Sequence, residues 1–310
     1  MARFILGRLL LAVPVLLGVT VVSFMIIHLI PGNPAQAMLF GSNPTPQQVH
    51  NLENKLGLND PLYVQYFHYM SSLLQGNLGT SFVTGRTVAS EIVSRAPSTF
   101  ALSAAAMLVA ILIGIPLGII GGVAPNSIWD RVGRFVSVSG VAIPFFWLAL
   151  IVTLLFAVRL HWFPAVGTVG PKSMVLPAVA LGWGYAAILT RLLRGRLIEE
   201  YYSEYIKTAR AKGAGGMRVL FNHALRNAAI PTVTMLGLQI GNILTGAAVI
   251  EVIFGRPGLG SFLVHSISAK NIPVVQGTVL FIGVAYVLIN LVVDLFVGII
   301  DPRTRKAATA

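Results

Sequence analysis

The chain contains no cysteine and few charged residues. Of its 310 residues, 10% are charged and 55% are hydrophobic, whereas a soluble globular domain carries about a quarter charged residues. The absence of cysteine excludes disulfide bonds and thiolate metal sites. The low charge content and a mean hydropathy of +0.80 exclude an ordinary soluble domain and indicate that lipid surrounds much of the chain.

A nucleotide-binding loop is also missing. Such a loop ends in Gly-Lys-Ser or Gly-Lys-Thr, and the nearest stretch, Ala-Lys-Gly-Ala-Gly-Gly at 211–216, lacks that ending. The apolar segments hold no pair of neighbouring carboxylates, and the six histidines are scattered without helical i, i+4 spacing. We therefore expect no catalytic, cofactor-binding or metal-binding residue in this chain, and no enzymatic activity.

Long apolar blocks separate the polar segments. A helix needs about 20 apolar residues to cross the roughly 30 Å hydrocarbon core of a bilayer. The blocks therefore predict an all-α membrane protein with six transmembrane helices. We place the helices at 9–30, 98–122, 134–158, 176–194, 231–254 and 276–300. A cleaved signal peptide is the alternative for the first block, but that block exceeds the apolar core of about 7 to 15 residues that such signals have.

The basic residues predict the orientation of the helices. Most of the 22 Lys and Arg residues lie at the two termini, at 131–134 and between 191 and 226. Six spans put all of these segments on one side, which the positive-inside rule assigns to the cytoplasm. The net charge of +12 is thus spread between spans and is not gathered into a nucleic-acid-binding domain.

The chain divides into three regions under this topology. Residues 1–30 form the cytoplasmic N-terminus and the first span, and 31–97 form an extracytoplasmic loop. Residues 98–310 form a core of five spans with a long cytoplasmic loop at 195–230. Within the spans, the pairs Gly114 and Gly118, and Gly237 and Gly241, are spaced for close helix packing.

The extracytoplasmic loop predicts two short helices. Thr45, followed by proline and then Gln48, forms a capping box for the first helix, and Gly57 follows that helix as a left-handed C-cap. Asp60 and the proline after it repeat the start pattern, and Gly76 repeats the end. The second helix is rich in aromatic residues, which suits the membrane interface. A scaffold and a docking surface for an external partner both remain open.

The cytoplasmic loop predicts two further short helices. Acidic residues occupy the first turns of the first helix and basic residues its last turns, before Gly213. The second helix covers about 217–227, and Pro231 then opens the fifth span. Such a helix pair would serve as a lever that another protein pushes; a basic surface against anionic lipid is the alternative.

The same loop resembles the permeases of binding-protein-dependent ABC importers. Their signature is E-A-A, then a glycine, then I-x-L-P; this chain matches it at Ala209, Gly213 and Leu225. The departures, at Lys207, Thr208, His223 and Arg226, are the forms usual in the dipeptide, oligopeptide and nickel branch. The resemblance implies that the following residues contact an ATPase subunit: Lys207, Thr208, Ala209, Arg210, Ala211, Lys212, Gly213, His223, Leu225 and Arg226.

Further stretches along the chain resemble that branch. They lie at 31–35, where Asn33 replaces an acidic residue of the family, and at 56–62, 76–81, 253–260 and 301–303. The resemblance implies the fold of a type I importer permease in a bacterial inner membrane. It also implies a second homologous permease, two cytoplasmic ATPase subunits that hold ATP and Mg²⁺, and an extracytoplasmic solute-binding protein.

The substrate that this resemblance implies is a dipeptide or short oligopeptide. A nickel or glutathione importer is the alternative within the family. A secondary transporter driven by an ion gradient is the alternative from another class, and it would show internal repeats and broken helices around a midplane site.

Two acidic residues lie within or near the ends of predicted spans. Glu251 lies one turn before the external end of the fifth span, and ionisable residues in lipid are functional candidates. We expect Glu251 to line the outer vestibule or to help close an external gate; an inter-helix hydrogen bond is the alternative. Asp294, like Asp301 just after the last span, is expected to be a structural anchor that pairs with Arg303 or Arg305; a substrate site is the alternative.

Overall fold

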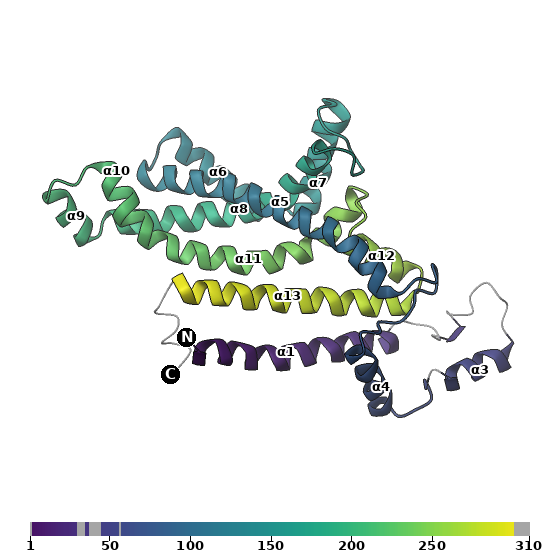
Figure 1. Cartoon of the computed structure of the whole chain (residues 1–310). Helices are drawn as coiled ribbons and strands as arrows, with labels where there is room; N and C mark the ends of the chain where they lie inside the picture. The colour runs from purple at the N-terminus through teal and green to yellow at the C-terminus, as the bar shows by residue number, and fades with distance from the viewer. Residues whose placement is uncertain (1, 30–34, 37–44, 56, 301–310) are drawn as a thin grey trace. The chain divides into compact units, whose positions relative to one another are not determined.

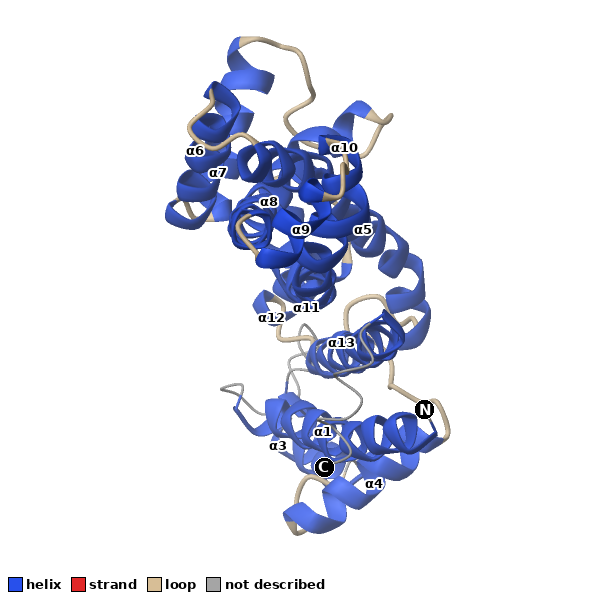
Figure 2. Ribbon diagram, turned by 90° about the vertical axis from the view of Figure 1, so that its left-hand side faces the viewer, coloured by secondary structure: helices blue, strands red, loops and turns tan. Residues whose placement is uncertain are grey.

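The computed structural model describes residues 2–29, 35–36, 45–55 and 57–300. Regular structure in this part of the chain is helical, apart from one isolated antiparallel bridge between Thr80 and Thr87 (Figures 1 and 2). The segments 31–34 and 301–303 lie outside the described residues, as do Arg303 and Arg305, the expected partners of Asp294.

The helices follow one another along the chain, and Figure 1 labels most of them. Their bounds are α1 Ala2–Leu29, α3 Pro46–Lys55, α4 Leu62–Leu74, α5 Val88–Val123, α6 Ile128–Ala142, α7 Phe145–Val152, α8 Lys172–Tyr201, α9 Glu204–Ala211, α10 Gly216–Arg218, α11 Leu225–Ile253, α12 Leu259–Ser268 and α13 Ile272–Ile300. Two π-helical segments are continuous with neighbouring helices, namely η1 Thr153–Arg159 after α7 and η2 Val219–Ala224 before α11.

Five helices in the described part are long and apolar enough to cross a membrane, and a bent pair makes a sixth candidate. They are α1, α5, α8, the continuous helix from α10 to α11, and α13. The bent pair joins α6 to α7 and η1 at an angle of 113°. The predicted all-α fold with six apolar spans is confirmed.

The third span, which we placed at 134–158, is not one continuous helix. Ile143 has the extended conformation φ −92°, ψ 118°, and it precedes Pro144, where the chain turns from α6 into α7. Proline has no backbone N–H to donate and disfavours the helical conformation of the residue before it. The helix axis therefore breaks inside the predicted range 134–158.

The prediction that Pro231 opens the helix of the fifth span was wrong. Pro231 lies inside α11, and the helical segment runs without a break from Gly216 to Ile253. Ala224, Ala228 and Thr232 are buried along one face of it, and this packing favours a continuous helix. The proline removes only one backbone hydrogen bond, which membrane helices tolerate.

Local capping signals before Pro46 shape α3 as expected. The Thr45 hydroxyl accepts a hydrogen bond from the Gln48 N–H at 3.3 Å, and the Gln48 side chain accepts one from the Thr45 N–H at 2.9 Å. Pro46 is the first helical residue, and Gly57 has φ +66°. The predicted capping box and the left-handed glycine are confirmed.

The start of α4 differs from the prediction by one residue. Pro61 is the N-cap and no side chain caps the helix, so Asp60 does not have the capping role we expected. A proline at the N-cap shifts the first helical residue to Leu62. Gly76 has φ +74° and follows the helix, as predicted.

The chain forms two compact units. The first comprises Met1–Gly7, Thr99–Arg256 and Ile289–Ala310, and the second comprises Arg8–Ser98 and Pro257–Leu288. The division falls within α1, α5 and α13 and between α11 and α12. In the first unit α8 packs against α6, α7 and α11. Its main core gathers apolar residues of α5, α7, η1, α8 and α11. The second unit has a smaller core that includes Val88, Ile92, Leu259 and Val274.

The glycine pair on α5 allows close contact with α8. A Cβ atom at Gly114 would lie 2.8 Å from the Cβ of Leu189, and one at Gly118 would lie 2.9 Å from the Cβ of Leu193. Both distances are too short for real side chains. The predicted use of Gly114 and Gly118 for helix packing is confirmed, since both let α8 lie close to α5.

Candidate functional site

The predicted coupling helix is α9, and its end is fixed by backbone hydrogen bonds. The Gly213 N–H donates to the Arg210 carbonyl at 2.9 Å, and the Ala214 N–H donates to the Ala209 carbonyl at 3.1 Å. Gly213 has φ +84°, the left-handed conformation that this Schellman motif requires. The predicted helix end at Gly213 is confirmed.

The α9 helix separates a polar face from an apolar one. Ile206 is completely buried, in a cluster with Leu193 and Leu197 of α8 and with Val219 and Leu220. Ala209 is half-buried. The exposed residues of the predicted coupling set on this segment are Lys207, Thr208, Arg210, Ala211, Lys212 and Gly213. The structure thus brings these predicted residues together on one accessible surface above an apolar base.

The other predicted coupling residues lie on the adjoining helical segment. His223 in η2 is half-buried, and Leu225 at the start of α11 packs at the edge of the same apolar cluster. Arg226 is exposed. The second cytoplasmic helix of our prediction is therefore the first part of a longer helix, because η2 continues into α11 without a break.

A tyrosine network that the sequence did not reveal joins three helices beside this surface. Asn227 donates a hydrogen bond to the Tyr205 hydroxyl at 3.0 Å, and the same hydroxyl contacts the Glu200 carboxylate. The Arg210 guanidinium lies 5.4 Å above the Tyr201 ring. Burial, together with the Glu200 carboxylate, raises the pKa of Tyr205 above its usual value. The run of tyrosines at 201–205 was the available signal.

Glu251 lies within the packed core of the first unit. It is completely buried on α11, and its Oε1 accepts a 2.5 Å hydrogen bond from the Thr99 hydroxyl on α5. The inter-helix hydrogen bond that we gave as the alternative role is therefore present. Arg256, which is 5% exposed, follows the end of α11. Burial lowers the pKa of Arg256 and the negative charge of Glu251 opposes that shift, so the two residues interact electrostatically.

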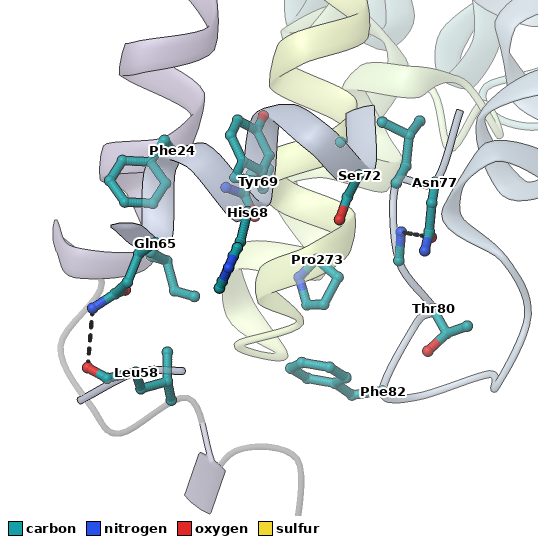
Figure 3. A pocket seen from close by; sticks show the side chains of 15 residues that line it. Phe24, Leu58, Gln65, His68, Tyr69, Ser72, Asn77, Thr80, Phe82 and Pro273 are labelled. Atoms are coloured by element: carbon teal, nitrogen blue, oxygen red, sulfur yellow. Dashed lines mark hydrogen bonds between the residues drawn. The ribbon is translucent and has the colours of Figure 1, made fainter. Parts of the chain in front are cut away.

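The second unit contains a cavity of about 350 Å³ (Figure 3). Its walls come from the end of α1, from α4, from the segment 77–82 and from the start of α13. The lining combines aromatic or apolar groups with neutral polar ones and includes Phe24, His68, Tyr69, Ser72, Asn77, Phe82 and Pro273. Among the described residues that line the cavity, none is Asp, Glu, Lys or Arg.

Hydrogen bonds fix one wall of this cavity. The Asn271 side chain accepts from the Phe82 N–H at 3.1 Å and donates to the Ser81 hydroxyl at 2.8 Å. Asn271 is 3% exposed and precedes α13, so it anchors the loop that carries Phe82. On the opposite wall, Gln65 donates to the Leu58 carbonyl at 3.0 Å (Figure 3). The cavity is therefore preformed by the chain itself.

Two family profiles cover nearly the whole chain. The family described as binding-protein-dependent transport system inner membrane component matches residues 114–306. The N-terminal membrane component of the same transport systems matches residues 1–103.

Curated relatives match over their full length. The dipeptide transport system permease protein DppB of Alkalihalophilus pseudofirmus is 41% identical over 98% of this chain and 100% of its own. The glutathione transport system permease protein GsiC is 40% identical in Salmonella choleraesuis, over 98% of this chain and 99% of its own. The GsiC of Escherichia coli strain K12 is 39% identical with the same coverage.

A solved structure has a similar fold. It is the MetNI methionine ABC transporter in an inward-facing conformation, whose matched chain is 20% identical with a TM-score of 0.54. The match covers 68% of this chain and 96% of the other. At this identity the likeness supports the fold alone.

Proposed function

Because the chain belongs to the family of binding-protein-dependent transport system inner membrane components and is the permease subunit of an ABC importer, we propose that it imports dipeptides or short oligopeptides. The observation that carries the substrate class is the 41% identity to a dipeptide permease over the full length of both chains. Glutathione, itself a small peptide, is the second candidate, supported by the 40% identity to a glutathione permease.

We propose that the ATPase subunit docks on the surface formed by α9 and η2. Besides the exposed polar residues of α9, the segments that adjoin it in the chain carry three large exposed apolar side chains, Tyr202 (74%), Met217 (71%) and Phe221 (52%). Exposed apolar side chains in a polar surround are typical of protein interfaces. Ile206 of α9 and two leucines of α8 belong to one apolar cluster. A displacement of α9 by the ATPase would therefore also move α8.

The remaining partners follow from the same assignment. The importer contains a second homologous permease and two ATPase subunits that hold ATP and Mg²⁺. Both termini and the α9 surface face the cytoplasm, in agreement with the positive-inside rule. The extracytoplasmic solute-binding protein docks on the second unit, where the preformed cavity between α4 and the start of α13 accepts a protruding side chain.

Glu251 has the role of an external gate residue in this proposal. Its carboxylate links α5 to α11 near the end predicted to be external, through the bond with Thr99. A buried carboxylate held by a hydroxyl and by the charge of Arg256 favours one packed arrangement of these helices. Opening the gate would exchange these contacts for water.

The proposed function is tested with the complete importer in lipid nanodiscs and in proteoliposomes. We expect the solute-binding protein loaded with dipeptide to stimulate ATP hydrolysis, and labelled dipeptide to accumulate in vesicles only with ATP. Accumulation of glutathione in preference to dipeptides would replace the first substrate by the second. Uptake that follows an ion gradient and proceeds without ATP would overturn the proposal.

A further inference from the structure

A buried carboxylate connects three helices of the first unit at the end that also carries α9. Asp130, in the first turn of α6, is completely buried. Its Oδ1 accepts a hydrogen bond from Arg194 Nε at 2.5 Å, and its Oδ2 accepts one from Arg194 Nη2 at 3.2 Å. Arg194 lies on α8, so this two-point ion pair joins α6 to α8. Bidentate pairs of this kind fix the orientation of both side chains.

The same carboxylate also organises the turn between α5 and α6. Its Oδ2 accepts the backbone N–H of Asn126 at 2.9 Å, and Arg134 Nη2 lies 3.4 Å away. The Asp130 N–H donates to the Ser127 hydroxyl, which caps α6. Asn126 has φ +65°, so the turn that the carboxylate stabilises contains a residue in the left-handed conformation. Asp130 therefore fixes the hairpin of α5 and α6 as well as α8.

Gly121 on α5 leaves room for this ion pair. A Cβ atom at Gly121 would lie 2.9 Å from Asp130 Oδ1 and 3.3 Å from Arg194 Cδ. Any side chain at this position would push the two charged groups apart. The neighbouring Gly195 on α8 has nothing within 4 Å of its Cβ position, so it offers a matched control.

Arg194 lies on α8 next to residues of the apolar cluster that packs under α9. Leu193 and Leu197, on either side of it along α8, lie in the cluster that buries Ile206 of α9. A displacement of α9 therefore reaches α8 within one helical turn of Arg194. From Arg194 the bidentate contact carries the displacement to the α5–α6 hairpin.

We propose that Asp130 is a positioning residue that makes the α5–α6 hairpin move together with α8 and α9 when the ATPase subunit pushes. The proposal rests on the docking of the ATPase at α9 described above. The bidentate ion pair adds a contact of fixed geometry to the apolar packing between α6 and α8. Asp130 and Arg194 hence determine how many solute molecules are imported for each ATP hydrolysed.

The test compares solute uptake and ATP hydrolysis by the complete importer in proteoliposomes. Asp130→Asn removes the charge at nearly constant size, and Gly121→Ala crowds the pair without changing any charge. We expect each variant to lower the number of solute molecules imported per ATP by about threefold to tenfold, with ATP hydrolysis maintained. Arg194→Lys keeps the positive charge but cannot make the two-point contact, so it should also lower the ratio, whereas Gly195→Ala should retain the wild-type ratio.

Three results would overturn the inference. An unchanged number of solute molecules imported per ATP in Asp130→Asn would show that the ion pair does not couple ATP hydrolysis to transport. A parallel loss of uptake, ATP hydrolysis and assembled complex in both Asp130→Asn and Gly121→Ala would show that it is only structural. A wild-type ratio in Arg194→Lys would show that the two-point contact between Asp130 and Arg194 does not matter. A wild-type importer that does not transport peptides would instead overturn the proposed substrate, and the ratio is then measured with the solute that it does transport.

Discussion

The hydroxyl of Thr99 on α5 donates a 2.5 Å hydrogen bond to the Glu251 carboxylate on α11, although 152 residues separate them in the sequence. The two side chains are buried in the first unit, and Arg256 experiences the charge of Glu251. Removing one member of a buried charged network leaves the others without compensation, which costs about 3–5 kcal/mol when a full charge is stranded. The contact therefore makes the gate proposal for Glu251 testable.

Glu251→Gln retains a side chain that can bond with Thr99 but removes the negative charge. If the charge controls a gate, uptake should fall by about tenfold while expression and assembly remain normal, a barrier change of about 1.4 kcal/mol. Uptake of labelled dipeptide into proteoliposomes measures this. Thr99→Val is the control for the hydrogen bond alone and should have the smaller effect. Unchanged uptake by Glu251→Gln at normal expression would remove the gate role.

Gly213→Arg should uncouple the ATPase from the permease. A left-handed conformation costs a non-glycine residue about 1–2 kcal/mol, and Gly213 has φ +84°. The substitution would therefore distort the end of α9, and we expect uptake and stimulated ATP hydrolysis both to fall. Gly215→Arg is the matched control, because Gly215 has φ −65° and open space around its Cβ position. Intact uptake and ATP hydrolysis in an assembled Gly213→Arg importer would refute the proposal that α9 is a lever moved by the ATPase subunit.

The sequence predicted the features of this fold that depend on local chemistry. The cap of α3 follows from Thr45 and Gln48, which are three residues apart, and the end of α9 follows from Gly213. Two prolines show which features cannot be predicted from the local sequence. Pro144 lies where the third span breaks, whereas Pro231 lies within a continuous helix. Whether a proline bends a helix depends on the surfaces that pack beside it, and these are not visible in the local sequence.

The candidate site divides in the same way. The exposed residues of α9 were predictable because a family motif and a helix pattern mark one contiguous segment. The pairs Thr99 with Glu251 and Asp130 with Arg194 were not, since they join residues 152 and 64 positions apart. A charged residue next to a span has several candidate partners, and only the fold selects one of them.

Gln239→Met should stabilise the protein in the conformation described here. Gln239 is 2% exposed on α11, and neither its Oε1 nor its Nε2 has a hydrogen-bond partner among the described residues. An unpaired buried amide costs about 1–3 kcal/mol, and methionine has a similar length without that cost. We expect a melting temperature higher by a few degrees in detergent.

The control for Gln239→Met is Gln239→Glu, which places a charge at the same buried position and should lower the melting temperature. A lower melting temperature for Gln239→Met than for wild type would mean that the amide is satisfied in the folded protein. It would then be a stabilising group.

Filling the cavity of the second unit should weaken the response to the solute-binding protein. Ser72 lines the cavity (Figure 3), whereas its sequence neighbour Ser71 is exposed and is not a lining residue. Ser72→Trp would occupy much of the roughly 350 Å³ available, since a tryptophan side chain is among the largest. We expect the concentration of binding protein needed for half-maximal stimulation of ATP hydrolysis to rise about tenfold, with basal hydrolysis unchanged, which corresponds to about 1.4 kcal/mol of docking free energy. Ser71→Trp adds the same bulk one residue away and should leave the stimulation curve at its wild-type position. If the curves of both variants coincide with that of the wild type, the solute-binding protein docks elsewhere on the permease.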